Sequence, residues 1–369
     1  MEDSYRLKEE DVLFARSGAT AGKTYIHSAG IGQAIFAGYC IRFRFDSSKV
    51  LPKFVYYYSK NNRYKSWVKS IQRPSGQPNI NKEEFKSFTI PLPLLGVQKN
   101  LVNDMETALQ VRRKKLRQAD ELLGGLDEWL MDRLGLTPSP ADERTVFALR
   151  LKQLRGHRID VPAYRPFFAK GQPPKTLLTS LSNLARIDIH RLDSPEDKNE
   201  LVPYIGLPEC EQTEVREVVM RPYHEVKGRS IVKPGDILFA RIEPSIFNKK
   251  YVFVEDLKGH EYAYTSTEFY VVTPNHSEAD PHYLYAMFFC SFVFNQVKGK
   301  TTGSSGRRRL DPELFRSLQF PKPSMKMQQT IATEVRRRRE EARRLRAEAE
   351  AEWENAKISF EEKLLGNRG

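Results

Sequence analysis

The sequence predicts an α+β protein that contains one structural unit twice, each copy ending in a long helix. Two pairs of segments carry this prediction. Residues 11–16 (DVLFAR) return as residues 236–241 (DILFAR), and residues 85–93 (FKSFTIPLP) return as residues 315–323 (FRSLQFPKP). Both copies then continue into a long charged stretch with helical character. A repeat that keeps the order, spacing and type of its elements indicates a pseudo-twofold molecule.

The first copy is predicted to consist of strands, one short helix and loops. Residues 11–16 form a compact apolar run, and residues 38–45 alternate as a strand does. Residues 51–70 are aromatic and polar, and Pro52 near their start favours a helix. Residues 74–78 (PSGQP) are typical of a turn-rich loop. Residues 89–93 (TIPLP) should be extended, because a proline disfavours helical backbone in the residue before it.

The long stretches at the end of each copy are predicted to pair as a coiled coil. Leucine or valine recurs every seven residues between 102 and 130, which is the spacing of a coiled-coil seam. Gly124 and Gly125 interrupt this stretch and should kink it, at a cost of about 1 kcal/mol each relative to alanine. The second stretch has a seam rich in alanine, which permits close backbone approach: Ala342, Leu345, Ala349, Trp353, Ala356, Phe360 and Leu364.

The second copy is longer than the first and is rich in predicted strands. These strands lie at residues 214–220, 236–241, 251–255 and 266–273, and residues 281–297 match the aromatic helix of the first copy. We therefore divide the chain into a first globular domain (1–97), a long helix (98–134), a linker (135–153), a second globular domain (154–327) and a second long helix (328–366). The first copy lacks a counterpart of roughly the first 80 residues of the second.

Composition favours a soluble, cytoplasmic protein with a polyanionic partner. The net charge is +13, yet residues 98–134 carry seven cations against seven anions, and residues 328–366 carry nine against nine. The positive excess therefore lies in the globular parts. Such a basic surface either serves solubility alone or contacts a polyanion while the neutral helices pair with protein. The three cysteines form no CxxC pair, so a disulfide framework or zinc site is not indicated. No apolar run approaches the roughly 20 residues that cross a bilayer, and the polar N-terminus does not resemble a secretory signal.

Enzyme motifs are poorly supported. Residues 17–24 (SGATAGKT) end like a phosphate-binding P-loop, but Ser17 stands where that motif needs its first glycine. The residues that follow, Tyr25 to His27, look like a strand and not the helix that a P-loop requires. No methyltransferase motif, paired carboxylates or metal-like histidine spacing stands out. A basic turn between two strands is the favoured interpretation, and a P-loop enzyme remains the weaker alternative.

Basic loops at equivalent places in both copies are better candidates for a site. The loop at 298–309 (KGKTTGSSGRRR) combines five cations with hydroxyl groups and glycines, and its counterpart at 69–79 combines cations with Gln and Asn. Lys, Arg and Ser suit phosphate contacts, and Arg, Gln and Asn suit base edges. The candidate DNA-contacting residues are Arg16, Lys23, Arg73, Gln77, Asn79, Arg241, Lys249, Lys250, Lys298, Lys300, Arg307, Arg308 and Arg309. The three consecutive arginines are expected to contact mainly phosphates.

These motifs, taken in order, resemble the DNA-specificity (S) subunits of type I restriction–modification systems. The resemblance rests on residues 233–241 (KPGDILFAR), their shorter form at 10–18, residues 74–80 (PSGQPNI), residues 90–98 (IPLPLLGVQ) and residues 158–166 (RIDVPAYRP). It implies a non-catalytic adaptor with two target-recognition domains, each reading half of a split sequence in double-stranded DNA. It also implies an antiparallel coiled coil that spaces these domains. Partners would be two modification (methyltransferase) subunits, which bind S-adenosylmethionine, and restriction subunits, with no cofactor on this chain and no membrane.

The first copy departs from this pattern. It has no counterpart of residues 158–166 or of most of residues 201–232, so its target-recognition domain is expected to be truncated at the N-terminus. A start site placed too late, a gene fragment or a part supplied by another chain would each account for this. A coiled-coil scaffold or another kind of nucleic-acid-binding protein remains the second alternative function.

Overall fold

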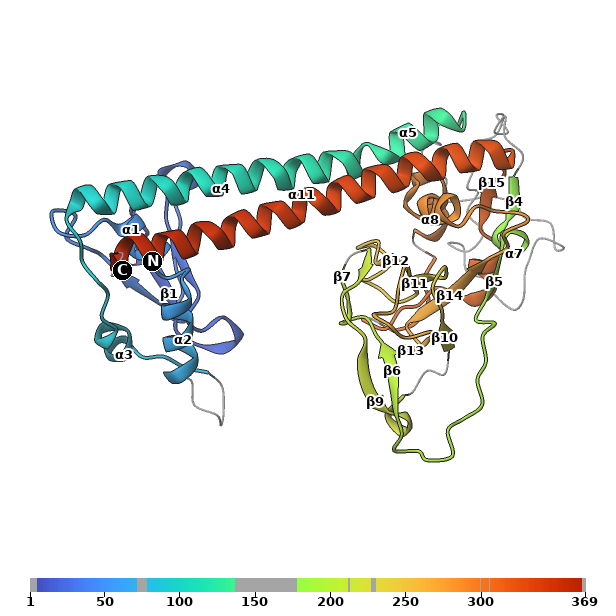
Figure 1. Cartoon of the computed structure of the whole chain (residues 1–369), viewed down its shortest axis with the longest axis horizontal. Helices are drawn as coiled ribbons and strands as arrows, with labels where there is room; N and C mark the ends of the chain where they lie inside the picture. Colours follow the sequence, from blue (N-terminus) through green and yellow to red (C-terminus); the bar gives the residue numbers. More distant parts are fainter. Residues whose placement is uncertain are drawn as a thin grey trace. The chain divides into compact units, whose positions relative to one another are not determined.

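Figure 1 shows a computed structural model of the chain, and it divides into two compact units. The structure describes residues 5–71, 78–136, 178–211, 213–226, 230–298, 300–304 and 306–366. The first unit comprises Met1–Asp120 with Ala342–Gly369, and the second comprises Glu121–Glu341. The predicted linker beyond residue 136 and the segment at 158–166 lie outside the described residues. The two units are described separately below.

The first unit is built on a three-stranded antiparallel sheet. Strand β1 (Val12–Ala15) lies between β2 (Thr24–Ile26) and β3 (Cys40–Phe43), and Phe14 is paired with Thr24 on one side and Ile41 on the other. The helices are α1 (Pro52–Tyr58), α2 (Asn62–Ile71) and α3 (Lys82–Ser87), with short 3-10 turns at Gly18–Thr20 and Ala29–Ile31. Proline at the first position of α1 suits a helix start, because its missing N–H would have no helical partner there.

The core of the first unit lies between one face of this sheet and its helices. Phe14 is its centre, with ring centroids 5.1 Å from Phe43 and 5.2 Å from Phe85. Phe360, from the C-terminal long helix, is buried and stacks on Phe54 at 5.7 Å. The long helix is therefore part of this core, which explains why the Ala-rich seam carries the aromatic residues Trp353 and Phe360 toward its end.

The second unit contains two four-stranded sheets. One has the order β12-β11-β14-β5 and the other the order β10-β13-β6-β9; β15–β4 and β7–β8 form two-stranded pairs. Strand β13 pairs in parallel with β6, whereas the other pairs are antiparallel. The strands are β4 (Leu178–Ser180), β5 (Ala185–Ile187), β6 (Leu201–Ile205), β7 (Cys210–Glu211), β8 (Glu214–Val215), β9 (Val219–Pro222), β10 (Ser230–Val232), β11 (Ile237–Ala240), β12 (Tyr251–Phe253), β13 (Ala263–Thr265), β14 (Phe269–Pro274) and β15 (Gln319–Pro321).

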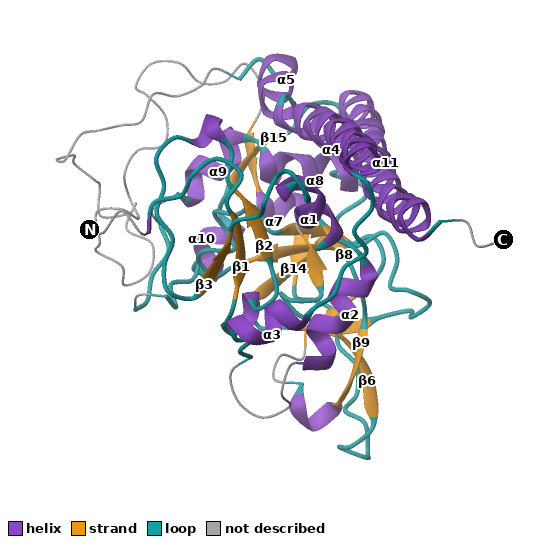
Figure 2. Cartoon of the chain, turned by 90° about the vertical axis from the view of Figure 1, so that its left-hand side faces the viewer, coloured by secondary structure: helices purple, strands orange, loops and turns teal. Residues whose placement is uncertain are grey.

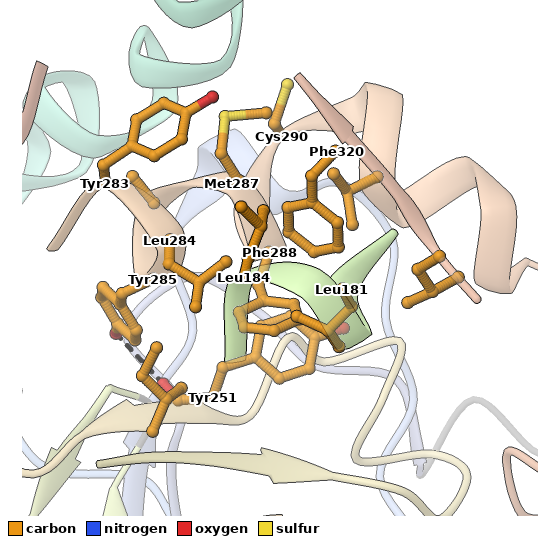
Figure 3. Close-up of a cluster of buried hydrophobic side chains, with 14 of the residues drawn as sticks. Leu181, Leu184, Tyr251, Tyr283, Leu284, Tyr285, Met287, Phe288, Cys290 and Phe320 are labelled. Atoms are coloured by element: carbon orange, nitrogen blue, oxygen red, sulfur yellow. Dashed lines mark hydrogen bonds between the residues drawn. The ribbon is translucent and has the colours of Figure 1, made fainter. Parts of the chain in front are cut away.

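The main core of the second unit is aromatic (Figure 3). Its helices are α7 (Leu181–Leu184), α8 (Pro281–Phe289), α9 (Ser291–Val297) and α10 (Pro312–Arg316), with a 3-10 turn at Tyr223–Glu225. The buried tyrosines satisfy their hydroxyl groups on backbone carbonyls: Tyr285 donates to Tyr251 at 3.1 Å, and Tyr283 donates to Pro321 at 2.7 Å. A buried hydroxyl without such a partner would be costly, so these bonds help to fix α8 against β12 and β15.

The repeat found in the sequence is also a repeat of hydrogen bonds. The Gln98 amide donates to Pro93 O and Lys49 O and accepts from the Leu51 N–H. Gln328 makes the same three bonds with Pro323, Glu278 and Asp280. Asn81 caps α3 and Asp311 caps α10, each accepting two backbone N–H groups. These matched bonds confirm the duplicated unit, with β1, β2 and β3 corresponding to β11, β12 and β14.

The long helices run antiparallel where their pairing is described. They are α4 (Leu95–Gly124), α5 (Leu126–Arg133) and α11 (Met325–Leu365), and α4 and α11 lie side by side in Figures 1 and 2. In the first unit, Arg112 pairs with Glu350 at 3.0 Å and Asp104 pairs with Lys363 at 2.8 Å. Residue numbers therefore increase along α4 as those of their partners decrease along α11, which makes the two helices antiparallel. In the second unit, Arg338 lies over the Trp129 ring at 5.1 Å. The α+β fold and the long helices are confirmed.

Some predicted elements are divided in the structure. The first long helix breaks at Gly125, as its glycine pair predicts. The single helix predicted at 51–70 is wrong, because α1 ends at Tyr58 and α2 begins at Asn62. The strand predicted at 214–220 is wrong for the same kind of reason, since β8 and β9 are separate and pair with different strands. No helix among the described residues is long and apolar enough to span a membrane.

Candidate nucleic-acid interface

In the first unit, the turn after β1 lies against the end of the predicted basic loop. The Ile80 N–H donates to Arg16 O at 2.7 Å, and the Gly18 N–H donates to Pro78 O at 2.9 Å. Ser17 and Asn79 form an isolated antiparallel bridge. Residues 16–18 and 78–80 are thus joined by backbone hydrogen bonds, although residues 19–77 lie between them in the sequence. The fold brings Arg16 and Asn79 together at one edge of the sheet.

The second unit repeats this arrangement with the same backbone bonds. The Leu310 N–H donates to Arg241 O at 2.8 Å, and the Glu243 N–H donates to Arg308 O at 2.9 Å. Ile242 and Arg309 form the isolated bridge that corresponds to Ser17 and Asn79. We call residues 16–24 together with residues 78–80 the first paired loops. We call residues 241–250 together with residues 300–310 the second paired loops. Recurrence of the candidate loops at equivalent places is therefore a structural fact.

Lysine occupies equivalent positions at the far end of each turn. The Ala15 N–H donates to Lys23 O at 2.8 Å, and the Ala240 N–H donates to Lys250 O at 3.2 Å. The Lys23 side chain is exposed. The Lys250 ammonium instead donates to Leu207 O, and the Lys249 ammonium donates to Phe289 O at 3.2 Å. Lys23 is thus free to meet a ligand, whereas Lys249 and Lys250 are partly engaged by their own domain.

The three consecutive arginines of the second paired loops make different contacts with the rest of the domain. The Arg309 guanidinium donates to both Glu268 carboxylate oxygens, from Nε at 2.9 Å and Nη2 at 2.5 Å. This hydrogen-bonded carboxylate raises the pKa of Arg309 further above its usual value. Arg308 donates to Thr301 O at 2.9 Å, with its Nε 4.0 Å from the Glu243 carboxylate. The Arg307 side chain is exposed, and no described residue forms an ion pair with it.

Arg241 points inward and helps to fix the paired loops. Its guanidinium lies 4.6 Å from the centroid of the Tyr270 ring, and its Nε is buried without a hydrogen-bond partner among the described residues. The Tyr270 hydroxyl donates to Leu310 O at 2.7 Å, next to the bond between Leu310 and Arg241. Burial raises the pKa of Tyr270, so the phenol stays protonated and keeps this bond at neutral pH. Arg241 therefore has a positioning role that its sequence motif does not reveal.

Two glycines shape these loops through their backbone. Gly303 has φ of +126°, and a Cβ there would lie 2.8 Å from Arg307 O. Gly22 has φ of +83°, and a Cβ there would lie 2.5 Å from Val68. Glycine tolerates positive φ at little cost and brings no side chain into such close contacts. Gly303 thus allows the chain to fold back beside the arginines, and Gly22 allows the first turn to lie on α2.

The remaining candidates are distributed as follows. Lys298 follows α9 and is exposed, while Lys300 is half-buried and its N–H donates to Val297 O at 3.0 Å. Arg16 is half-buried and Asn79 is exposed. Arg73 and Gln77 lie outside the described residues. The residues that the fold brings together are therefore Arg16, Lys23 and Asn79 in the first unit, and Arg241, Lys250, Arg307, Arg308 and Arg309 in the second.

The sequence analysis did not identify Glu268, the acidic partner of Arg309 in the second paired loops. It also did not identify Tyr39, the residue at the equivalent position in the first unit. The Arg241 N–H donates to Glu268 O, and the Arg16 N–H donates to Tyr39 O, so Glu268 and Tyr39 are equivalent. Tyr39 is 62% exposed. The first unit therefore presents a tyrosine and an amide, Tyr39 and Asn79, where the second presents an ion pair. Alignment of residues 38–45 with 267–274 would have located this difference.

The P-loop-like segment at residues 17–24 does not have the structure of a P-loop. Residues 24–26 form strand β2, as predicted, so the P-loop-like segment lacks the helix that would bind a phosphate. Among the described residues, no cluster of three or more His, Cys, Asp or Glu side chains could hold a metal ion. The three cysteines are free thiols, and burial raises the pKa of Cys210 and of Cys290 to about 12, which makes both poor nucleophiles.

Comparison with known proteins gives a family match in the first unit. A family model described as the type I restriction modification DNA specificity domain matches residues 2–116. The type I restriction enzyme StySPI specificity subunit of Salmonella potsdam is 28% identical over 109 residues, which make up 28% of this chain and 24% of that protein. The matched stretch thus spans about a quarter of that relative's length.

One solved structure shows a likeness of fold. A chain in a structure on complex assembly and conformational transition of the type I R-M system gives a TM-score of 0.52 at 13% identity, over 98% of this chain and 84% of that chain. The S subunit of a type I restriction–modification system from M. genitalium gives a TM-score of 0.42 at 13% identity, over 100% of this chain and 86% of that one. At these identities the first of these matches speaks for the fold alone.

Proposed function

We infer that this chain is the DNA-reading subunit of a type I restriction–modification complex. Its residues 2–116 match the family model of the type I restriction modification DNA specificity domain. The family match is the observation that carries this proposal. The duplicated paired loops support it, because each unit offers its own set of basic and amide side chains at an equivalent place. Two such sets suit a target made of two separated half-sites in duplex DNA.

In this proposal, the paired loops contact DNA in two ways. Exposed cations such as Lys23, Lys298 and Arg307 bind phosphates, which sets the orientation of each unit without reading sequence. Asn79 and Tyr39 in the first unit are the groups best placed to reach base edges or sugars, since both are exposed and uncharged. The two units would then read different half-sites, because their equivalent positions differ in chemistry.

The long helices supply the protein contacts in this proposal. Their charge is balanced, and ion pairs such as Lys115 with Glu348 at 2.8 Å connect them within the first unit. Such a surface has little attraction for DNA phosphates, and it suits docking of two modification subunits, with restriction subunits as further partners. The chain itself is non-catalytic and binds no cofactor in this proposal. S-adenosylmethionine belongs to the modification subunits.

A methylation assay tests this proposal. The full chain, its cognate modification subunits and S-adenosylmethionine are incubated with plasmid DNA, and the methylated adenines are mapped by sequencing. Methylation should require this chain and should fall within a single split sequence motif. The modification subunits alone should give none. Methylation that proceeds without this chain, or that ignores sequence in its presence, would refute the proposal.

A further inference from the structure

In the second unit, the turn between β11 and β12 is anchored at several points. Ile246 is completely buried in the main core, and its carbonyl accepts the Tyr251 hydroxyl at 3.0 Å. The Ile246 N–H donates to Ile242 O at 3.0 Å, and the Lys249 ammonium donates to Phe289 O at 3.2 Å. A core side chain, the backbone and a lysine thus hold the turn, which restrains the positions of the side chains that it exposes.

Two consecutive residues of this turn, Phe247 and Asn248, are exposed. Phe247 is 39% exposed although it is apolar, and its ring meets the Phe294 ring edge-on, with centroids 6.2 Å apart. No described residue bonds the side-chain amide of Asn248. The backbone N–H of Asn248 donates to Pro244 O at 3.0 Å, so the turn does not use the side-chain amide. The tip of the turn therefore presents an apolar ring next to an unused amide.

Cations lie near both the tip and the base of this turn. Lys298 is exposed, and its N–H donates at 3.2 Å to the carbonyl of Phe294, the residue whose ring meets Phe247. At the base, the Glu243 N–H donates to Arg308 O at 2.9 Å, which joins the turn to the three arginines. The Glu243 carboxylate lies 4.0 Å from Arg308 Nε, so the acidic side chain of the turn is already near a cation. A polyanion attracted to these cations therefore meets the tip of the turn.

The equivalent turn of the first unit has no such tip. Residues 17–22 (SGATAG) form a turn two residues shorter than residues 242–249 (IEPSIFNK), and they include neither an aromatic ring nor an amide side chain. The exposed ring and amide of the first unit are instead Tyr39 and Asn79. Each unit thus offers one ring and one amide beside its basic loops, but from different segments of the duplicated unit.

We propose that Phe247 and Asn248 read two neighbouring A·T base pairs in the half-site bound by the second unit. An asparagine amide accepts a hydrogen bond from adenine N6 and donates one to adenine N7, and a phenylalanine ring makes an apolar contact with the thymine methyl. Consecutive Cα atoms lie about 3.8 Å apart and stacked base pairs about 3.4 Å apart, so adjacent residues suit adjacent base pairs. This inference rests on the proposed function, because it names base-reading residues of the same DNA site.

Specificity profiling of the intact complex is the first test. The full chain or a variant, its cognate modification subunits and S-adenosylmethionine are incubated with plasmid DNA, and the methylated sites are sequenced. Asn248→Ala should lower the preference for one A·T pair roughly tenfold, in one half of the motif only. Asn199→Ala is the matched control, because Asn199 is an exposed asparagine of the second unit that lies before β6, outside the paired loops. This control should leave the motif unchanged.

Base analogues provide a second test that does not depend on whether a variant folds. Duplexes of the mapped target carry uracil in place of the thymine assigned to Phe247, or 7-deazaadenine in place of the adenine assigned to Asn248. With the wild-type complex, the missing methyl should weaken binding about fourfold and the missing N7 acceptor about fivefold. The uracil penalty should vanish in Phe247→Ala and the 7-deazaadenine penalty in Asn248→Ala. Leu201→Ala, which removes an exposed apolar side chain on β6, should keep both penalties.

The outcomes separate this inference from the proposed function. If the wild-type complex methylates a split motif and both tip variants keep that motif, the inference is overturned and the proposed function stands. The inference also fails if neither half contains neighbouring A·T pairs, or if the analogue penalties persist in the variants. Loss of complex assembly in Phe247→Ala, seen by size-exclusion chromatography, would make the tip a protein contact and overturn the inference too. If the wild-type complex shows no sequence-directed methylation, both proposals fall.

Discussion

The Arg309 guanidinium is held by the Glu268 carboxylate through two hydrogen bonds, at 2.9 and 2.5 Å. A cation neutralised in this way is a weaker phosphate ligand than an exposed one, because the carboxylate must first be displaced. The cluster of three arginines is therefore three different groups: Arg307 is exposed, Arg308 bonds a backbone carbonyl, and Arg309 forms an ion pair. The sequence alone gives no reason to expect different DNA contacts from these three arginines.

Replacing Glu268 with glutamine should strengthen binding to duplex DNA of any sequence. The substitution Glu268→Gln keeps the size of the side chain but removes the charge that neutralises Arg309. The number of phosphates contacted should rise by about one, and so should the slope of log affinity against log salt concentration. Fluorescence anisotropy over a salt series measures this slope. An unchanged slope would mean that Arg309 does not face the DNA backbone.

Replacing Arg307 with alanine should weaken binding about equally on all duplex sequences. Arg307 is exposed and lies beside the paired loops, so it suits a phosphate contact. Its loss should lower the salt slope by about one. Arg316→Ala is the control, because Arg316 is a partly exposed arginine on α10 already paired with Glu313. A loss confined to one base pair of the target would identify Arg307 as a base reader.

Gly303→Ala should destabilise the second unit by about 1–3 kcal/mol, the cost expected for a strained backbone conformation. The φ of +126° disfavours any side chain, and the added Cβ would lie 2.8 Å from Arg307 O. Gly306→Ala is the control, since Gly306 also has positive φ but has open space around its Cβ position. Urea unfolding of both variants measures the difference. Equal losses in the two variants would show that the close approach to Arg307 is unimportant.

Stability should rise with pH between about pH 8 and 10 because of Lys60. Burial, reinforced by Lys65, lowers the pKa of Lys60 from 10.5 to about 8 in the folded protein. Between these values the unfolded chain binds a proton that the folded chain does not, so folding becomes more favourable as pH rises. The slope is at most about 1.4 kcal/mol per pH unit. Urea unfolding of wild type and Lys60→Met should differ in this slope, and parallel curves would contradict the assignment.

The repeat, the α+β class and the recurrence of the candidate loops in both copies follow from the sequence because each depends on local pattern and order. DVLFAR and DILFAR are short apolar runs that form strands in both copies, and Gln98 and Gln328 each bond the equivalent proline, Pro93 and Pro323. What the pattern cannot give is the identity of partners across the sheet. Glu268 meets Arg309 only through the register of β14 beside β11, and register depends on the whole packed unit.

The aromatic segment at 51–70 shows a second limit of sequence patterns. Its helical character is evident, yet the break between α1 and α2 includes Asn61, which is almost fully buried with no partner for its amide among the described residues. A buried asparagine between two helices depends on tertiary packing, and the helix propensities of single residues do not describe tertiary packing. The candidates Arg241 and Lys250 lie in the second paired loops, but their side chains turn toward the protein, which composition alone could not predict.

Selection of DNA from a random duplex library is the most direct test of the central claim that this chain reads DNA through two sets of paired loops. The full chain with its cognate modification subunits is bound to the library at near-physiological salt, and retained duplexes are sequenced. A single motif with two specified halves and an unspecified spacer is expected, and Asn79→Ala should relax only one half. Retained DNA without sequence preference, or one continuous motif unaffected by changes in either unit, would contradict the account.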